Sequence, residues 1–464
     1  MTAARTHRTA EEIGRTERGP RELPPLGRTK QVPLPDVITG TLPNGLKVLA
    51  AHRPGVPMVE ALLRIPAASP SPVADPEWTA GTEVLAETLL AGTASRDRVG
   101  IDDDLAAVGA ELGVGVDPEW LQVGGSALAS GLPELLDVLG DVLTGATHPD
   151  DEVARERDRL VERIAVARAQ PRTVAREALQ RLRFGDHPIV SEMPTAEAVE
   201  AVTAERVRAL HADVVVPEGA TLVLVGDIDP DAAIAAVGEH LGGWTGDHPA
   251  RRLSAPPMPA PGDVRLVHRP GSVQSQLRLT APGVDRSDPR HPAFQLANLV
   301  FGGYFSSRWM ENIREDKGYT YGAHSGQEIV PGGAVLSLDA DVAGDVTAAA
   351  LLETRYELGR MIAVPPTEQE VAAARQYAIG SLLISLDSQS SLAGTLSSLD
   401  AAGLDVEWLR ERPARLEAVT TEEVAAAAAE FFAPSRITGV VVGDAEQVGP
   451  RLTALGGVTV EEQA

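Results

Sequence analysis

The chain has 464 residues, a formal charge of −25 and a sequence pI near 4.8. Nucleic acids and anionic lipid surfaces bind basic faces, so this charge excludes both as electrostatic partners and favours basic or neutral ones. Because the sequence contains no cysteine, a disulfide framework, a thiolate metal site and a cysteine nucleophile are excluded. Residues 1–36 carry many arginines but no apolar run, which predicts a disordered tail on a cytoplasmic protein without a membrane segment.

The first half of the chain is predicted to combine antiparallel strands with helices. In TLPNGLKVLAA at 41–51, the Asn-Gly pair predicts a hairpin turn, and VEALLRI at 59–65 is the expected return strand. Apolar residues spaced three and four apart then predict helices at 81–92, 131–146 and 151–170.

An internal repeat divides the chain. Glu-Ala-Val-Thr at 200–203 recurs at 417–420, and Val-Gly-Asp at 225–227 recurs at 442–444, so both matches have the same offset along the chain. Agreement of separate matches in one register indicates a duplication rather than a coincidence.

The two copies predict two domains joined by a linker. The Pro-rich stretch at 246–262 favours extended backbone and is the expected linker. We therefore predict homologous α+β domains at 37–245 and 263–464. Each would be a mainly antiparallel sheet with helices packed on one face, and the two would close around a chamber.

The second half contains the segment FGGYFSSRWMENIREDKGYTYG at 301–322. We expect a helix at 306–317 that begins at a Ser-Ser cap and ends before Gly318. Trp309 and Ile313, one helical turn apart, would lie on its buried stripe.

This segment resembles the C-terminal-domain motif of the pitrilysin/insulinase superfamily of zinc peptidases, especially its processing-peptidase branch. The shared features are the Gly pair, the Ser-Ser-Arg helix start, the Arg-Glu pair and the closing Gly-x-x-Tyr. The resemblance extends over the first half and implies that Arg314 and Tyr321 reach a peptide substrate beside a zinc ion. Gly302 and Gly303 are candidate substrate-binding residues that permit close backbone approach, although glycine at a helix entry is equally a turn device.

Active members of that superfamily carry H-x-x-E-H on a helix, where two histidines bind zinc and the glutamate is the general base. Here Val84 and Thr88 occupy the histidine positions, while Glu87 keeps the position of the base. Arg163 stands at the probable place of the third ligand, and a one-residue shift would restore Glu162 there. No two of the ten histidines have the close spacing of a zinc pair on a helix, so we expect this chain to bind no zinc.

The leading hypothesis is therefore the non-zinc-binding subunit of a heterodimeric metallopeptidase. A homologous partner with an intact H-x-x-E-H would hold the zinc, and the peptide substrate would add as an extended strand to a sheet edge. The alternative is a catalytically silent scaffold or binding subunit of a larger assembly. An independent serine hydrolase is not favoured, because the serines near 306 lack a G-x-S-x-G elbow. Whether the substrates are processed or degraded stays open.

Overall fold

The computed structural model describes residues 34–246 and 248–461, so most of the tail predicted at 1–36 lies outside the described residues. Pro35–Ala464 form one compact unit. None of the described helices is both long and apolar enough to cross a bilayer. The stretch between Leu241 and Val264, where the linker is predicted, contains no helix or strand among its described residues.

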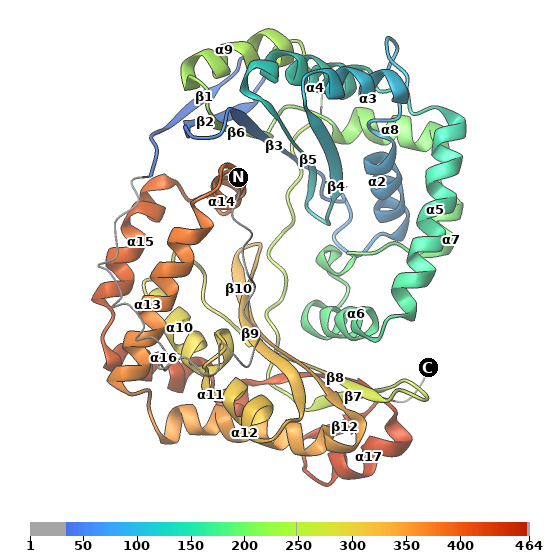
Figure 1. Cartoon of the computed structure of the whole chain (residues 1–464). Helices are drawn as coiled ribbons and strands as arrows, with labels where there is room; N and C mark the ends of the chain where they lie inside the picture. The colour runs from blue at the N-terminus through green and yellow to red at the C-terminus, as the bar shows by residue number, and fades with distance from the viewer. Residues whose placement is uncertain (1–33, 247, 462–464) are drawn as a thin grey trace, which may run out of the picture. The chain divides into compact units, whose positions relative to one another are not determined.

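Two six-stranded sheets, which share the order of five of their six strands and differ only in the edge strand at one side, confirm the α+β class and the duplication (Figure 1). The first sheet has the strand order β1 (Val37–Thr41), β2 (Lys47–His52), β6 (Thr221–Gly226), β3 (Met58–Pro66), β5 (Trp120–Leu128), β4 (Glu111–Val116). The second has the order β12 (Val458–Val460), β7 (Val264–His268), β11 (Thr438–Gly443), β8 (Gln274–Pro282), β10 (Gly333–Ala343), β9 (Thr320–Val330). The second and third strands run parallel in both sheets, and the antiparallel pairs predominate.

The helices also repeat in order. In the first half they are α2 (Pro76–Thr88), α3 (Arg98–Ala107), α4 (Leu132–Gly145), α5 (Asp150–Ala169), α6 (Pro171–Phe184), α7 (Ala196–Glu200), α8 (Ala204–Val214) and α9 (Pro230–Leu241). In the second half they are α10 (His291–Asn298), α11 (Arg308–Met310), α12 (Thr347–Ala363), α13 (Glu368–Ser385), α14 (Gln389–Ala401), α15 (Val406–Ala418), α16 (Thr421–Phe431) and α17 (Ala445–Thr453). Helices α8 and α16 begin and end at equivalent positions, in the register that the repeat predicts.

The predicted first hairpin is only partly correct. Asn44 and Gly45 form the expected turn between β1 and β2, and Gly45 has the positive φ of 93° that such a turn favours. The return strand is wrong, because β3 pairs with β6 and β5, and β6 lies between β3 and β2. β2 pairs in parallel with β6, which is far along the sequence, instead of pairing with β3. A turn signal predicts only pairing between neighbouring strands, so it does not predict this long-range pairing.

One face of each sheet is covered by a helix that belongs to the other half of the chain. Helix α14 packs on β6 and β3 of the first sheet, and α6 packs on β8 and β11 of the second (Figure 1). Every residue of β6 and of β11 is buried as a result. The two halves therefore exchange equivalent helices, since α6 and α14 occupy corresponding positions in the repeat.

One charged residue on each exchanged helix enters the opposite sheet. Arg183 of α6 has a side chain only 1% exposed and donates hydrogen bonds to Thr280 (3.0 Å), Glu328 (2.7 Å) and Ser337. Its repeat equivalent on α14 is Asp400, which accepts from Lys47 (2.6 Å) and Thr221 (2.8 Å) of the first sheet. Arg183 and Asp400 therefore stand at the same position of the repeat and make equivalent contacts with the opposite sheet, but they carry opposite charges.

A hydrogen-bonded pair of histidines, His148 buried and His211 partly buried, lies next to α2. His211 Nε2 donates to the Leu143 carbonyl oxygen (3.0 Å), so its Nδ1 accepts from His148 Nε2 (3.0 Å). His148 Nδ1 lies 2.9 Å from the Thr88 hydroxyl, which also donates to the Val84 carbonyl oxygen (2.7 Å). His211 must be neutral in this arrangement, because a second proton would place its Nδ1 donor against the His148 Nε2 donor.

Acid should weaken the fold through His148. Burial, then the neighbouring His211 and Arg208, lowers the pKa of His148 to about 3 from its usual 6.5. The unfolded chain therefore binds a proton below pH 6.5 that the folded chain does not, and stability is lost as pH falls from 6.5 towards 3. This costs about 2 kcal/mol of the free energy of unfolding between pH 7.5 and pH 5.

Urea unfolding at pH 7.5, 6.5 and 5 measures this effect. His148→Asn is the matched variant, because asparagine tolerates the positive φ of 44° at this position and does not titrate. Its free energy of unfolding should depend less steeply on pH than that of the native chain. Equal slopes for the two proteins would contradict the assignment.

Candidate functional site

The segment that carries Arg314 is a helix with irregular hydrogen bonding. Helix α11 continues into a π-helical stretch, η4 (Glu311–Asp316), with Trp309 and Ile313 buried as expected. Gly318 follows with a φ of 64°, and its amide donates to the Arg314 carbonyl oxygen (3.1 Å). The sequence therefore predicts the end of this helix and its buried stripe correctly, whereas the helix begins at Arg308, two residues later than predicted.

The start of the segment is fixed differently from the prediction. Ser307 stands at the N-cap position, but its hydroxyl makes no capping hydrogen bond. Arg308 instead forms a two-point ion pair with Glu370 of α13, at 2.6 and 2.8 Å, and donates to the Val364 carbonyl oxygen (2.7 Å). Hydrogen bonds to Glu370, chiefly the one from Arg308, lower the pKa of its carboxyl to about 2, so the contact persists over the physiological pH range.

Arg314 contacts the backbone of Tyr321, while the role of both residues at a peptide substrate stays a prediction. Arg314 Nε donates to the Tyr321 carbonyl oxygen (3.0 Å), and the guanidinium lies over the Phe305 ring at 4.5 Å from its centroid. Glu315 forms an ion pair with Arg314 Nη1. Tyr321 is the second residue of the edge strand β9 and is 95% exposed, so its phenol projects away from this chain. Arg314 is held in place, whereas the Tyr321 side chain is accessible to another molecule.

Gly302 and Gly303 lie where α10 continues into the π-helical stretch η3 (Leu299–Gly303), which packs against β9. A Cβ at Gly302 would stand 2.9 Å from both Ser325 Oγ and a Trp309 ring atom. A Cβ at Gly303 would stand 2.8 Å from Asn298 Nδ2. Close packing inside the domain accounts for both glycines, and their predicted contact with substrate stays a prediction.

The degenerate zinc motif lies on α2, with its two histidine positions turned into the core. Val84 and Thr88 are both fully buried. Glu83 and Glu87, one turn apart, occupy a more accessible face, and Arg163 Nη2 contacts Glu87 Oε1 at 2.6 Å. Zinc does not fit here, because a guanidinium already pairs with the carboxylate. The described residues include no group of three or more His, Asp or Glu that could hold a metal.

Glu83 is the residue that the sequence argument missed. Burial, and then the charge of Glu87, raises the pKa of Glu83 to about 7. A signal was present: if the H-x-x-E-H motif is aligned one residue closer to the N-terminus, Glu83 and Glu87 fall at the two histidine positions. In this alternative alignment, acidic residues one turn apart replace both histidines.

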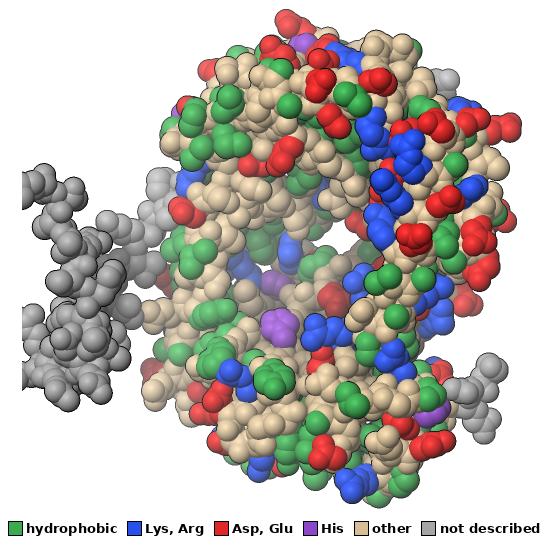
Figure 2. All heavy atoms as spheres, turned by 45° about the vertical axis from the view of Figure 1, so that its right-hand side comes forward, with side chains coloured by type: hydrophobic (Ala, Val, Ile, Leu, Met, Phe, Trp, Pro, Cys, Tyr) green, Lys and Arg blue, Asp and Glu red, His purple; other side chains and the backbone are tan. Residues whose placement is uncertain are grey.

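A pocket of about 660 Å³ lies between α6 and the second sheet, next to Tyr321. Its lining combines arginines of α6 with His324, Asp339 and Asp341 of β9 and β10. Asp341 pairs with Arg172 and with Arg278, each at 2.7 Å, and burial raises the pKa of Asp339. Figure 2 shows the molecule hollowed on one face, with basic side chains and histidine beside the hollow.

Comparison with known proteins identifies relatives along most of the chain. Residues 201–377 match the family described as the Peptidase M16 inactive domain. An uncharacterized zinc protease of Mycobacterium leprae is 26% identical over 398 residues, 84% of this chain and 88% of the relative. One of Streptomyces coelicolor is 26% identical over 84% of this chain and 86% of the relative. A probable inactive metalloprotease of Bacillus subtilis is 23% identical over 62% of this chain and 67% of the relative.

Solved structures share the fold. A peptidase M16 inactive domain from Pseudomonas fluorescens aligns with a TM-score of 0.78 at 22% identity, covering 88% of this chain and 98% of that chain. A protease from Helicobacter pylori aligns with a TM-score of 0.78 at 16% identity, covering 88% of this chain and 100% of that chain. At these identities the likeness concerns the fold alone.

Proposed function

We propose that this chain, whose residues 201–377 match the Peptidase M16 inactive domain, is the non-zinc-binding subunit of a heterodimeric metallopeptidase of the pitrilysin/insulinase superfamily. A homologous subunit with an intact H-x-x-E-H supplies the zinc, and this chain supplies Arg314 and Tyr321 to the bound peptide. The description of the matched domain and that of the Bacillus subtilis relative, both with the word inactive, support a non-catalytic member of the family.

The observation that carries the proposal is the pairing of a fixed arginine with an exposed tyrosine. Arg314 is held by the Tyr321 carbonyl oxygen, Phe305 and Glu315, which orients the N–H donors that these contacts leave free towards a peptide carbonyl. The Tyr321 hydroxyl is a further donor for the oxyanion that develops when the scissile carbonyl is attacked. A side chain that is 95% exposed has no packing role within the described chain.

The scaffold alternative is supported by the ion pair between Arg163 and Glu87. This pair gives the glutamate at the position of the general base a partner within the chain, in place of a zinc-bound water. A scaffold subunit requires no zinc. It also gives no reason for Arg314 and Tyr321 to lie together, so the peptidase subunit is the better-supported function.

Reconstitution tests the proposal. Purified alone, the chain is expected to bind no stoichiometric zinc on metal analysis and to cleave no fluorogenic peptide, because no described residues form a zinc site. Mixed with a homologous chain that carries H-x-x-E-H, it should produce cleavage that exceeds that of the partner alone. One equivalent of tightly bound zinc in this chain would overturn the assignment, and a complex without added cleavage would favour the scaffold.

A further inference from the structure

The two halves contain pockets at equivalent places in the repeat. In the first half, a pocket of about 270 Å³ lies between α2, α5, α6 and the stretch at 191–195. In the second half, a pocket of about 650 Å³ lies between the equivalent helices α10, α13, α14 and the helix α15. Trp408 and Arg412 of the second pocket are the repeat equivalents of Ser191 and Thr195 of the first. The duplication therefore supplies an internal comparison.

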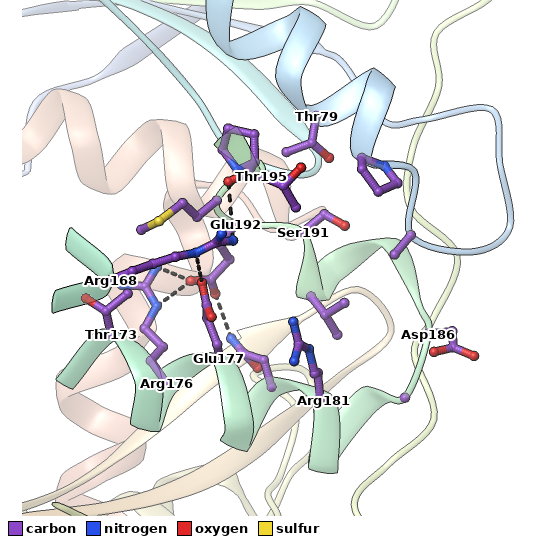
Figure 3. A pocket seen from close by; sticks show the side chains of 17 residues that line it. Thr79, Arg168, Thr173, Arg176, Glu177, Arg181, Asp186, Ser191, Glu192 and Thr195 are labelled. Atoms are coloured by element: carbon purple, nitrogen blue, oxygen red, sulfur yellow. Dashed lines mark hydrogen bonds and ion pairs between the residues drawn. The ribbon is translucent and has the colours of Figure 1, made fainter. Parts of the chain in front are cut away.

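The first pocket neutralises its own charges. Three arginines and three acidic residues line it, and Figure 3 shows the ion pairs among them. Arg176 pairs with Glu192, and Arg168 lies 3.5 Å from Glu177. Gln180 also donates to Glu192 (2.6 Å). No further charge is required there to balance the arginines.

The second pocket has the opposite character. Two arginines, Arg286 and Arg412, line it, and the described residues of its lining include no Asp or Glu. Arg412 is only 4% exposed, yet among the described residues no carboxylate lies within ion-pair distance of it. The nearby Arg415 is already paired with Glu411. Asp285 is the acid whose charge acts on Arg286 and His291, but it does not line the pocket, and it accepts hydrogen bonds from Ser287.

Arg412 is held in one orientation by neutral groups. Its Nη2 donates to His291 Nδ1 (2.8 Å) and to Gln295, and its guanidinium lies 5.0 Å from the Trp408 ring centroid. His291 Nε2 donates in turn to Gln327 (2.8 Å), which fixes the tautomer that accepts from Arg412. Nε and Nη1 of Arg412 have no hydrogen-bond partner among the described residues. Arg286 contacts one hydroxyl, that of Ser398 at 3.3 Å.

A buried guanidinium without an ion-pair partner among the described residues, beside a second, partly buried one, is costly. Burial, and then the charge of Arg286, lowers the pKa of Arg412 to about 10. At neutral pH both groups still carry charge, since an arginine does not lose its proton there. Buried charges in proteins are ordinarily paired, and a guanidinium offers parallel donors that match a carboxylate or a phosphate.

We propose that the second pocket binds a small molecule whose oxyanion, a phosphate or a carboxylate, is held by Arg412 and Arg286 while its apolar part contacts the pocket wall. Phe294, Leu382 and Leu399 provide that wall. The site lies among the helices of the second half, not at Arg314 and Tyr321, so it does not depend on the peptidase function. We infer an anionic ligand from a comparison of the two pockets. Three acidic residues accompany the arginines of the first-half pocket, whereas the described lining of the second-half pocket contains none.

Three probes of one size test the proposal: phenyl phosphate, benzoate and the uncharged benzamide, at constant ionic strength in chloride. Phenyl phosphate or benzoate should raise the melting temperature and give a calorimetric binding isotherm, because a ligand that binds the folded chain stabilises it. Benzamide should do neither. The stronger of the two anions identifies the oxyanion.

Arg412→Gln should weaken that binding at least tenfold, whereas Arg181→Gln, which removes an exposed arginine from the first pocket, should leave it unchanged. If Arg412→Gln does not fold, Arg286→Gln makes the same test. Equal responses to benzamide and benzoate would overturn the proposal. So would equal losses in the Arg412 and Arg181 variants, or no response to either anion at about 10 mM.

Discussion

Tyr321→Phe is expected to reduce the turnover number of the reconstituted peptidase by roughly a hundredfold to a thousandfold, a loss of about 3 to 4 kcal/mol in transition-state stabilisation. Only the hydroxyl is removed, and the ring of a 95% exposed residue makes no core contacts that the change would disturb. The effect should fall on turnover more than on KM, because the oxyanion develops after the substrate has bound.

Arg314→Ala should lower turnover as well, and it removes the contact that fixes the Tyr321 backbone. Tyr356→Phe is the matched control, since Tyr356 is an exposed tyrosine on α12 and is 57% accessible. Gel filtration of each variant with the partner should show an intact heterodimer. Unchanged kinetics for Tyr321→Phe would remove the proposed role even if the heterodimer forms.

Arg183→Met is expected to lower the free energy of unfolding by about 3 kcal/mol, the range found when one member of a buried charged contact is removed. Methionine keeps most of the volume, so the loss comes from the polar groups. Thr280 and Ser337 are buried and would lose their donor, whereas Glu328 is partly exposed and can be rehydrated. This places the effect at the lower end of that range.

Urea unfolding of the native chain and the variant measures the difference. Arg181→Met is the matched control, because Arg181 is exposed on the same helix and forms no ion pair among the described residues; a change within about 0.5 kcal/mol is expected there. Asp400→Asn tests the equivalent contact on α14 and should destabilise in the same direction, since it leaves Lys47 and Arg64 without their acid. Similar stabilities for Arg183→Met and Arg181→Met would show that the buried contact contributes little.

Much of the fold was accessible from local patterns. The constant offset between the repeated motifs identified the duplication, and the structure places α8 and α16, and β6 and β11, in that register. Trp309 and Ile313 were assigned to a buried stripe by their spacing alone. The first hairpin was misassigned at its return strand, because the insertion of β6 between β2 and β3 depends on a contact with a strand far along the sequence.

The sequence by itself determined the α+β class and the two homologous halves, because these follow from periodicity and repetition. The choice of Arg314 and Tyr321 came from the resemblance to a family, and their role stays a prediction. Tertiary structure decided which face of α2 carries Val84 and Thr88, and that Glu83 and Glu87 occupy the more accessible one. It also decided that acids line the first-half pocket, where two of the three arginines form ion pairs, and that no described acid lines the second. Burial and the partners of a charge depend on elements that only folding brings together, and no spacing along the chain specifies them.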